Sequence, residues 1–397
     1  MKKKKVLIIS PVVFRDFDYF RYEIKNLEKD FEVEVIIHEL TKIISPRFIK
    51  AYKNYYKSKK ILRFESYFIW KKEFRRLIDQ NPDLLIIKDI PNSNFFSFLI
   101  NLEIKKSKKK VLEYVSSGGL APKIGLSLKK INFFKLSFLK KIIFFLNGKI
   151  FNIFGNLFRL YPSHCLKAGS MGFKNIYNKF KVNIIDANTF DYSNYITYKK
   201  KIYKKTKEKI VIFLDSPAPL YHGDYLLTHD SNENLVKIKN WYPSLNNFFS
   251  NIENLLNAKV KISVHPKIDS PEARYKYKNI FEGREILKKR PLYYLNNTKL
   301  IVSKESTGFS FAVIKNIPLI ILTSKDIINE NRYIEYQKFL ARELGTNIFN
   351  IDDNFDLKKF HKLMEMNKKK YDEFKKKYLT SLNTLKPNYK LIGENFL

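Results

Sequence analysis

The sequence predicts an α/β protein with two Rossmann-like domains, each built on a doubly wound parallel sheet. The chain has 397 residues and is therefore long enough for two domains of about 150 residues each. Short apolar segments rich in β-formers alternate with segments of helical spacing, as expected for parallel sheets. The alternation stops at a lysine-rich run, residues 198–209, and then restarts. Two similar halves joined by a charged connection explain most of the chain.

The strand-like segments of the first half end in polar or glycine-containing turns. They lie at residues 5–10, 31–40, 82–90 and 109–119. Residues 20–30 have helical spacing, with Phe20, Ile24 and Leu27 on one face. We expect these elements to form an N-terminal domain over residues 1–190, and residues 170–209 to connect it to the second half.

The second half repeats the pattern with four further strand candidates. They lie at residues 209–219, 259–266, 298–306 and 317–324. A helical pattern covers residues 245–256, and a basic helix is expected from Leu357 to Leu382. We expect a C-terminal domain over residues 205–380 and a C-terminal tail over 381–397.

The composition limits the classes of protein to consider. The net charge is +36; a lysine-rich proteome explains part of it, and affinity for phosphates or anionic lipid is the functional interpretation. The single cysteine, Cys165, excludes an internal disulfide framework and fits a reducing compartment. No long uncharged apolar window predicts a transmembrane helix. We therefore expect a cytoplasmic protein.

Residues 126–160 interrupt the alternation with a basic, amphipathic segment that contains no acidic residue. Lysines border a broad apolar face in this segment: Lys129, Lys130, Lys135, Lys140, Lys141 and Lys149. An interfacial helix binds an anionic bilayer with such a face. The alternative is a helix packed on its own domain or on a partner. The membrane interpretation places the protein peripherally at the inner face of the cytoplasmic membrane.

Polar residues stand where two apolar strand candidates end. The first ends in His265, Pro266 and Lys267. The second ends in a turn that contains Ser303, Glu305, Ser306, Thr307 and Gly308. In open parallel sheets ligands bind outside the carboxyl ends of the strands, and imidazole, ammonium and hydroxyl groups bind phosphate oxygens. We predict a phosphate site here, with a ribose hydroxyl as the partner of Glu305. A structural strand cap is the alternative role for His265.

The segments "VHPK" and "SKESTGFSFAVIKNIPLI" resemble the His-Pro and Ser-Ser/Thr motifs of bacterial GT-B glycosyltransferases that use CMP-activated sugars. These are the sialyltransferase-like and Kdo-transferase-like enzymes of capsule and lipooligosaccharide synthesis. The resemblance is strongest over residues 205–350. It implies a GT-B-like fold, in which an N-terminal acceptor domain and a C-terminal nucleotide-sugar domain face each other across a cleft. It also implies that His265 contacts the CMP phosphate and that Ser306 and Thr307 hold phosphate or ribose.

The same family carries an acidic motif after an N-terminal strand, which supplies the general base. Here the comparable segment, "LEYVSSGGLAP", has Glu113 as its one acid. Asp16, which follows the first strand candidate, and Asp215, at the first strand end of the second half, are among the other candidates for a catalytic acid or base. Asp16 and Asp18 also spell D-x-D, a metal-binding motif of the other glycosyltransferase fold. Lysines around the site make a metal less necessary, so we expect neither a metal site nor a cofactor.

The predicted function is transfer of a CMP-activated nonulosonic or Kdo-type sugar from a nucleotide donor to a glycan or glycolipid acceptor. One alternative is a CDP-polyol phosphotransferase of the teichoic-acid type, because those enzymes also use a His-Pro turn and a serine-rich turn. Another is a non-catalytic polyanion-binding protein, but residues 126–160 are too apolar for a nucleic-acid surface, and no nucleic-acid partner is expected. Neither a P-loop, a G-x-G-x-x-G motif nor a G-x-S-x-G motif occurs.

Overall fold

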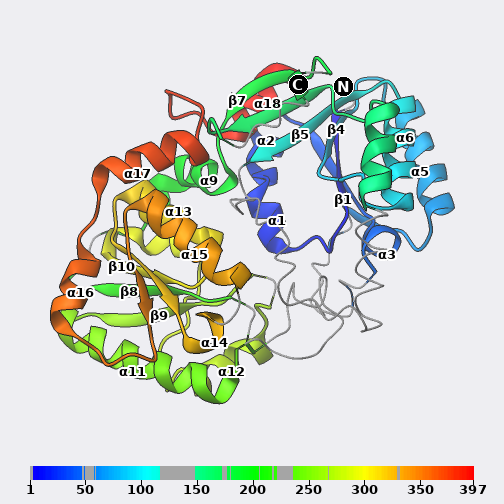
Figure 1. Ribbon diagram of the computed structural model, residues 1–397. Helices are drawn as coiled ribbons and strands as arrows, with labels where there is room; N and C mark the ends of the chain where they lie inside the picture. Colours follow the sequence, from blue (N-terminus) through cyan, green and yellow to red (C-terminus); the bar gives the residue numbers. More distant parts are fainter. Residues whose placement is uncertain are drawn as a thin grey trace, which may run out of the picture. The chain divides into compact units, whose positions relative to one another are not determined.

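The computed structural model describes residues 3–46, 49, 58, 60–116, 148–171, 177–178, 180–204, 206–216, 219–220, 236–266, 268–328 and 331–397. The chain divides into two compact units (Figure 1). The N-terminal unit contains the described residues up to 116, those of 148–190 and those of 381–397. The C-terminal unit contains the described residues of 191–380.

The N-terminal unit is built on a seven-stranded parallel sheet with the order β3-β2-β1-β4-β5-β6-β7. The strands are β1 (Lys5–Ser10), β2 (Glu34–Glu39), β3 (Ile61–Arg63), β4 (Leu85–Lys88), β5 (Lys110–Ser116), β6 (His164–Ala168) and β7 (Asn183–Ala187). The helices include α1 (Asp16–Arg21), α2 (Ile24–Asp30), α3 (Thr41–Ile44), α5 (Tyr67–Gln80), α6 (Phe95–Lys106) and α18 (Asn388–Phe396). Residues 148–157 form a further helix. The strand order reverses between β1 and β4, as in Rossmann folds.

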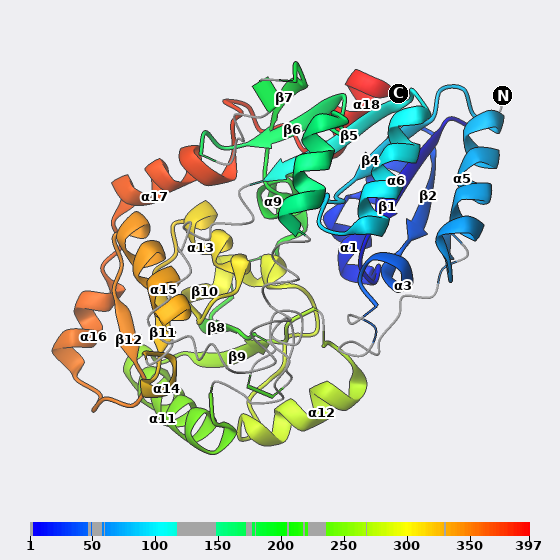
Figure 2. The ribbon, with the colours of Figure 1, turned by 45° about the vertical axis from the view of Figure 1, so that its right-hand side comes forward.

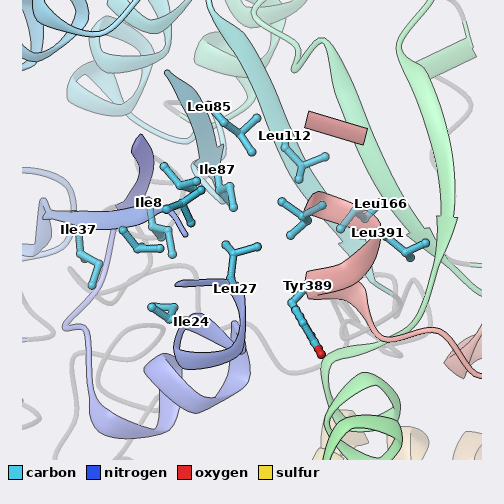
Figure 3. Close-up of a cluster of buried hydrophobic side chains, with 14 of the residues drawn as sticks. Ile8, Ile24, Leu27, Ile37, Leu85, Ile87, Leu112, Leu166, Tyr389 and Leu391 are labelled. Atoms are coloured by element: carbon cyan, nitrogen blue, oxygen red, sulfur yellow. The ribbon is translucent and has the colours of Figure 1, made fainter. Parts of the chain in front are cut away.

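Alternate residues of the central strands serve two separate cores, because successive side chains of a strand point to opposite faces. On one face Val6 and Ile8 pack with residues of α2 and α18, a cluster shown in Figure 3. On the other face Leu7 and Ile9 pack with residues of α5 and α6, which lie side by side in Figure 2. Both faces of the sheet are therefore covered, which explains why the central strands β1 and β4 are largely apolar.

The segment after residue 380 completes the N-terminal unit. The backbone N–H of Ser381 donates to the carbonyl of Ala187 at 2.9 Å, and the side chain of Asn388 accepts from the backbone N–H of Asn188 at 3.0 Å. Ile392 of α18 is fully buried in the core. A Cβ at Gly393 would lie 2.0 Å from the ring of Phe31, so glycine is required for this close approach.

The C-terminal unit is built on a five-stranded parallel sheet with the order β12-β11-β10-β8-β9. The strands are β8 (Ile210–Leu214), β9 (Lys259–Ser263), β10 (Thr298–Ser303), β11 (Leu319–Thr323) and β12 (Ile348–Asn350). The main helices are α11 (Ile238–Leu256), α12 (Pro271–Ile280), α13 (Ser310–Lys315), α15 (Asn331–Leu344), α16 (Leu357–Met364) and α17 (Lys368–Phe374). Counted from its first strand, this is the 2-1-3-4-5 order of doubly wound folds, with the reversal between β8 and β10.

The predicted fold class, two Rossmann-like parallel α/β units, is confirmed. Three predicted elements differ. The helix predicted at 20–30 is two helices, because Glu23 adopts a left-handed backbone conformation with φ 54°. The connection predicted at 170–209 contains β7 and α9 (Phe190–Tyr198). The helix predicted from Leu357 to Leu382 is divided into α16, α17 and a π-helical turn (Lys375–Leu379).

Candidate functional site

The strand-order reversal of the C-terminal unit gathers most of the predicted phosphate-site residues. In open α/β sheets the ligand binds at this switch point, outside the carboxyl ends of the strands. Asp215 directly follows β8, and Lys304 directly follows β10. The end of β9, the other neighbour of β8, leads to His265. Three adjacent strand ends therefore bring the candidates of this unit to one edge of its sheet.

Asp215 is buried, with 2% of its surface exposed. Its backbone N–H donates to the carbonyl of Ser263 at 3.1 Å, which extends the ladder between β8 and β9. Burial raises the pKa of the Asp215 carboxyl to about 7, although the Tyr277 hydroxyl and the Lys304 ammonium both favour its ionised form. A carboxyl with this pKa can exchange a proton near neutral pH.

Lys304 is a further candidate for this site that the sequence pattern does not indicate. It is 5% exposed, and its ammonium lies 5.6 Å from the centre of the Trp241 ring and 3.4 Å from a carboxylate oxygen of Glu305. Its carbonyl accepts from the side-chain amide of Gln337 at 3.2 Å, which fixes the backbone after β10. The available signal was a lysine at the end of an apolar strand. Because the chain is so rich in lysine, a lysine at this position does not stand out as a candidate site residue.

The serine-rich turn after β10 is held by its own side chains. The Oγ of Ser303 accepts from the backbone N–H of Ser306 at 3.1 Å, and the Oγ of Ser306 accepts from the backbone N–H of Gly308 at 3.3 Å. Thr307 is exposed at the tip of the turn. The two serines shape the loop, so Thr307 and the backbone of the turn are the groups best placed to meet a ligand.

The loop after β9 forms a tight turn at His265. The backbone N–H of Ile268 donates to the carbonyl of His265 at 3.0 Å. His265 and Pro266 are both half-buried. Lys267 lies outside the described residues. Arg284, a further basic residue near this strand, is bound by Glu253 at 2.9 Å and therefore has a structural role.

The two catalytic candidates of the N-terminal unit have different surroundings. Glu113 lies within β5, where the Tyr177 hydroxyl donates to its carboxylate at 2.8 Å. Asp16 is exposed in the first turn of α1. The loop before it is fixed by Glu39, which accepts from the backbone N–H of Phe14 at 3.0 Å. Among the described residues, no group of three His, Cys, Asp or Glu side chains is arranged to hold a metal ion.

Similarity to known proteins is found at the level of structure and not of sequence. The sequence matches no protein-family model, and it matches no curated protein. Among solved structures, the wall teichoic acid polymerase TagF is 10% identical with a TM-score of 0.50, covering 99% of this chain and 88% of that chain. A UDP-GlcNAc 2-epimerase from Methanocaldococcus jannaschii (13% identity, TM-score 0.46, 98% of each chain) is also similar. So is MurG from Acinetobacter baumannii (9% identity, TM-score 0.44, 99% of each chain). The likeness to TagF extends over both units, and the fold is GT-B-like.

Proposed function

We propose that the chain is a glycosyltransferase that takes a sugar from a nucleotide donor, with the donor phosphate at the switch point of the C-terminal unit. The observation that carries the proposal is the set of polar groups at the ends of β8, β9 and β10 in a GT-B-like fold. A buried ammonium, an imidazole and a hydroxyl-bearing turn together suit a phosphate whose negative charge grows as the sugar departs.

Each candidate takes a role that follows from its surroundings. Lys304 supplies positive potential from a buried position, where charges act with less screening. His265 and Thr307 donate hydrogen bonds to phosphate oxygens. Glu305, which lies beside Lys304, accepts from a ribose hydroxyl. Asp215 is half protonated near neutral pH, so its acid form donates a hydrogen bond toward the same phosphate instead of repelling it.

The general base is proposed to be Glu113, with Asp16 as the alternative. A base must reach the acceptor hydroxyl, and its orientation must be fixed. Tyr177 provides that orientation for Glu113. The strand-order reversal of the N-terminal unit, between β1 and β4, is one strand away from β5. An acceptor glycan or glycolipid in the N-terminal unit would therefore lie near this carboxylate.

The donor proposed is a CMP-activated sugar of the nonulosonic or Kdo type, on the strength of the His-Pro and Ser-Thr motifs. A CDP-polyol phosphotransferase of the teichoic-acid type is the second candidate. It uses the same two turns, and the structural likeness to a teichoic acid polymerase over 99% of the chain favours it at the level of fold.

Calorimetric titration of the full chain with CMP, CDP, UDP and GDP tests the proposal. We expect CMP to bind, and we expect His265→Ala and Lys304→Met each to weaken binding at least about tenfold through loss of a charge-assisted contact. Lys358→Met, an exposed lysine of α16, is the matched control and should bind as the wild type does. A preference for CDP would favour the polyol-phosphate reaction. A preference for UDP or GDP would discard the CMP-sugar assignment, and absence of all nucleotide binding would overturn the site.

A further inference from the structure

We propose that the N-terminal unit docks on an anionic lipid bilayer through an exposed apolar surface formed by α5, α6 and the helix of residues 148–157. This surface, called the apolar surface below, is represented by Phe68, Ile69, Phe95, Phe96, Ile153 and Leu157. The proposal does not depend on the proposed catalytic activity.

The exposure of these side chains is large. Phe68 is 78% exposed, Leu157 71% and Ile153 62%. Single exposed apolar residues are ordinary on a protein surface, but a contiguous group indicates an interaction site. Here the group comes from helices of different parts of the sequence, so its clustering is produced by the fold.

Ring contacts connect the three helices into one surface. The rings of Tyr67 and Phe96 lie 6.5 Å apart and join α5 to α6. The rings of Phe95 and Phe151 lie 6.2 Å apart and join α6 to the helix of residues 148–157. Phe98 adds a contact to Phe158 at 5.6 Å. The three helices are therefore packed side by side, and their exposed apolar residues lie on one group of helices.

A buried polar chain fixes the helix of residues 148–157. The ammonium of Lys88 donates to the side-chain oxygen of Asn101 at 2.7 Å, and the amide of Asn101 donates to the side-chain oxygen of Asn92 at 2.8 Å. Asn92 packs directly on Gly155, where a Cβ would lie 2.2 Å from its Nδ2 atom. The ammonium of Lys105 donates to the carbonyl of Phe158 at 2.5 Å. The helix thus presents its exposed face in a defined orientation, as a prepared docking surface requires.

The charges around the apolar surface identify the occupant. Residues 148–160 contain Lys149 and Arg159 and no acid, and both basic residues are exposed. Of the acids on α5 and α6, Glu73 pairs with Arg76, and Glu103 is bound by three cations: Lys71, Arg75 and Lys106. Glu65, just before α5, pairs with Lys42, and Asp79, at the C-terminal end of α5, is exposed. An apolar surface bordered by exposed basic side chains, with most of the neighbouring acids in ion pairs, fits an anionic bilayer interface. Among the described residues no helix is long and apolar enough to span a membrane, so the contact proposed is peripheral.

Vesicle flotation of the full chain, without nucleotide, tests this proposal. We expect the wild type to bind phosphatidylcholine vesicles that contain phosphatidylglycerol, and to bind less as salt is raised. The variant Ile153→Ser/Leu157→Ser removes two exposed side chains, so its partitioning should fall at least about tenfold without loss of folding. The matched control, Tyr275→Ser/Leu357→Ser, changes residues of the C-terminal unit that are 73% and 55% exposed; it should bind as the wild type does.

Three results would overturn the proposal. One is equal vesicle binding by the wild type and the folded Ile153→Ser/Leu157→Ser variant. Another is self-association of the wild type that this variant abolishes, which would show that a second copy covers the surface. The third is a preference for RNA over vesicles. If the double variant unfolds, Leu157→Trp gives a second readout, because a tryptophan that inserts shifts its emission to shorter wavelength on vesicle addition. Failure here leaves nucleotide binding by the C-terminal unit unaffected, so the two proposals are separable.

Discussion

His38 is a buried imidazole whose charge state should make stability depend on pH. It is fully buried in β2, its ring lies 4.9 Å from that of Phe64, and neither ring nitrogen has a hydrogen-bond partner among the described residues. Burial lowers the pKa of His38 from 6.5 to about 4. The folded protein therefore keeps it neutral, while the unfolded chain takes up a proton below pH 6.5.

The free energy of unfolding should consequently fall as the pH drops from about 6.5 to about 4. The contribution of His38 reaches at most about 3 kcal/mol, because one pKa unit corresponds to about 1.36 kcal/mol. In His38→Leu this contribution is absent, so the variant should lose less stability than the wild type on acidification. Urea unfolding at several pH values measures the difference. Equal slopes for both proteins would contradict the assignment.

Asp215 should have the opposite effect in the C-terminal unit. Its pKa is raised from 3.8 to about 7 by burial, so the folded form holds a proton that the unfolded chain releases above pH 3.8. The stabilisation is complete at low pH and is lost as the pH rises through about 7. Asp215→Asn should therefore be more stable than the wild type at pH 8, by about 1–4 kcal/mol, with no advantage near pH 4. Thermal unfolding at the two pH values checks this, and a variant less stable at pH 8 would contradict it.

At the level of single residues, the sequence predicted that His265 and the serine-rich turn follow the ends of apolar strands, and they do follow β9 and β10; their binding role stays a prediction. It did not locate Lys304, whose role depends on burial beside Trp241. It also did not reveal that Ser303 and Ser306 use their hydroxyls within the turn. Burial and hydrogen-bond partners arise from tertiary packing, which the local pattern does not contain.

At the level of helices and turns, replacing glycine by alanine should have different effects on stability at two positions, Gly155 and Gly308. A Cβ at Gly155 would lie 2.2 Å from the Asn92 side chain, whereas a Cβ at Gly308 would lie 3.4 Å from its nearest neighbour, the Ser306 hydroxyl. Gly155→Ala should therefore displace the helix of residues 148–157 and cost about 1–3 kcal/mol of stability. Gly308→Ala should leave stability within about 0.5 kcal/mol of the wild type.

Thermal unfolding of both variants measures their stabilities, and nucleotide titration measures their nucleotide affinities as a second readout. If the phosphate approaches the turn closely, Gly308→Ala weakens nucleotide binding without loss of stability. Gly155→Ala should retain nucleotide binding, because the proposed binding residues lie in the other unit. A destabilised Gly308→Ala variant with normal binding would contradict both the turn geometry and the proposed ligand contact.

Strands with strong apolar runs were predictable from the sequence, whereas short strands, an edge strand and β6, whose sequence HCLKA contains a histidine and a lysine, were not. All eight predicted strands overlap observed ones, whereas β3, β6, β7 and β12 were not predicted. β3 and β12 have only 3 residues each, too few to show a period. β7 lies at the edge of its sheet and is largely exposed, so its pattern lacks the continuous apolar character of the central strands.

For the whole molecule, the most informative feature is that residues 381–397 pack on the N-terminal unit, although they follow the C-terminal unit in the sequence. Tyr389, Leu391 and Ile392 are buried in the core formed with α2 and the N-terminal sheet. Removal of residues 381–397 should therefore expose one face of that sheet and destabilise the N-terminal unit by more than about 5 kcal/mol. The C-terminal unit, which ends at residue 380, should keep its own unfolding transition.

Differential scanning calorimetry of the truncated chain measures both transitions. Ile392→Ala provides a milder comparison, with an expected loss of about 2–5 kcal/mol in the N-terminal unit alone. A truncated protein that retains the N-terminal transition would show that α18 is dispensable. From the sequence, 381–397 is predicted only as a tail, because a single short helix carries no information about which distant surface it will cover.

The packing of α18 on the N-terminal unit also determines the order in which the two units can complete their folding during synthesis. When residue 380 has left the ribosome, every described strand of the C-terminal unit is available, but the earlier-made sheet still lacks the helix that covers part of one face. Domains commonly fold in the order in which they are translated. In this chain the unit translated first completes its folding last, and a nascent chain stalled near residue 380 would be a natural client for chaperones that shield exposed apolar surface.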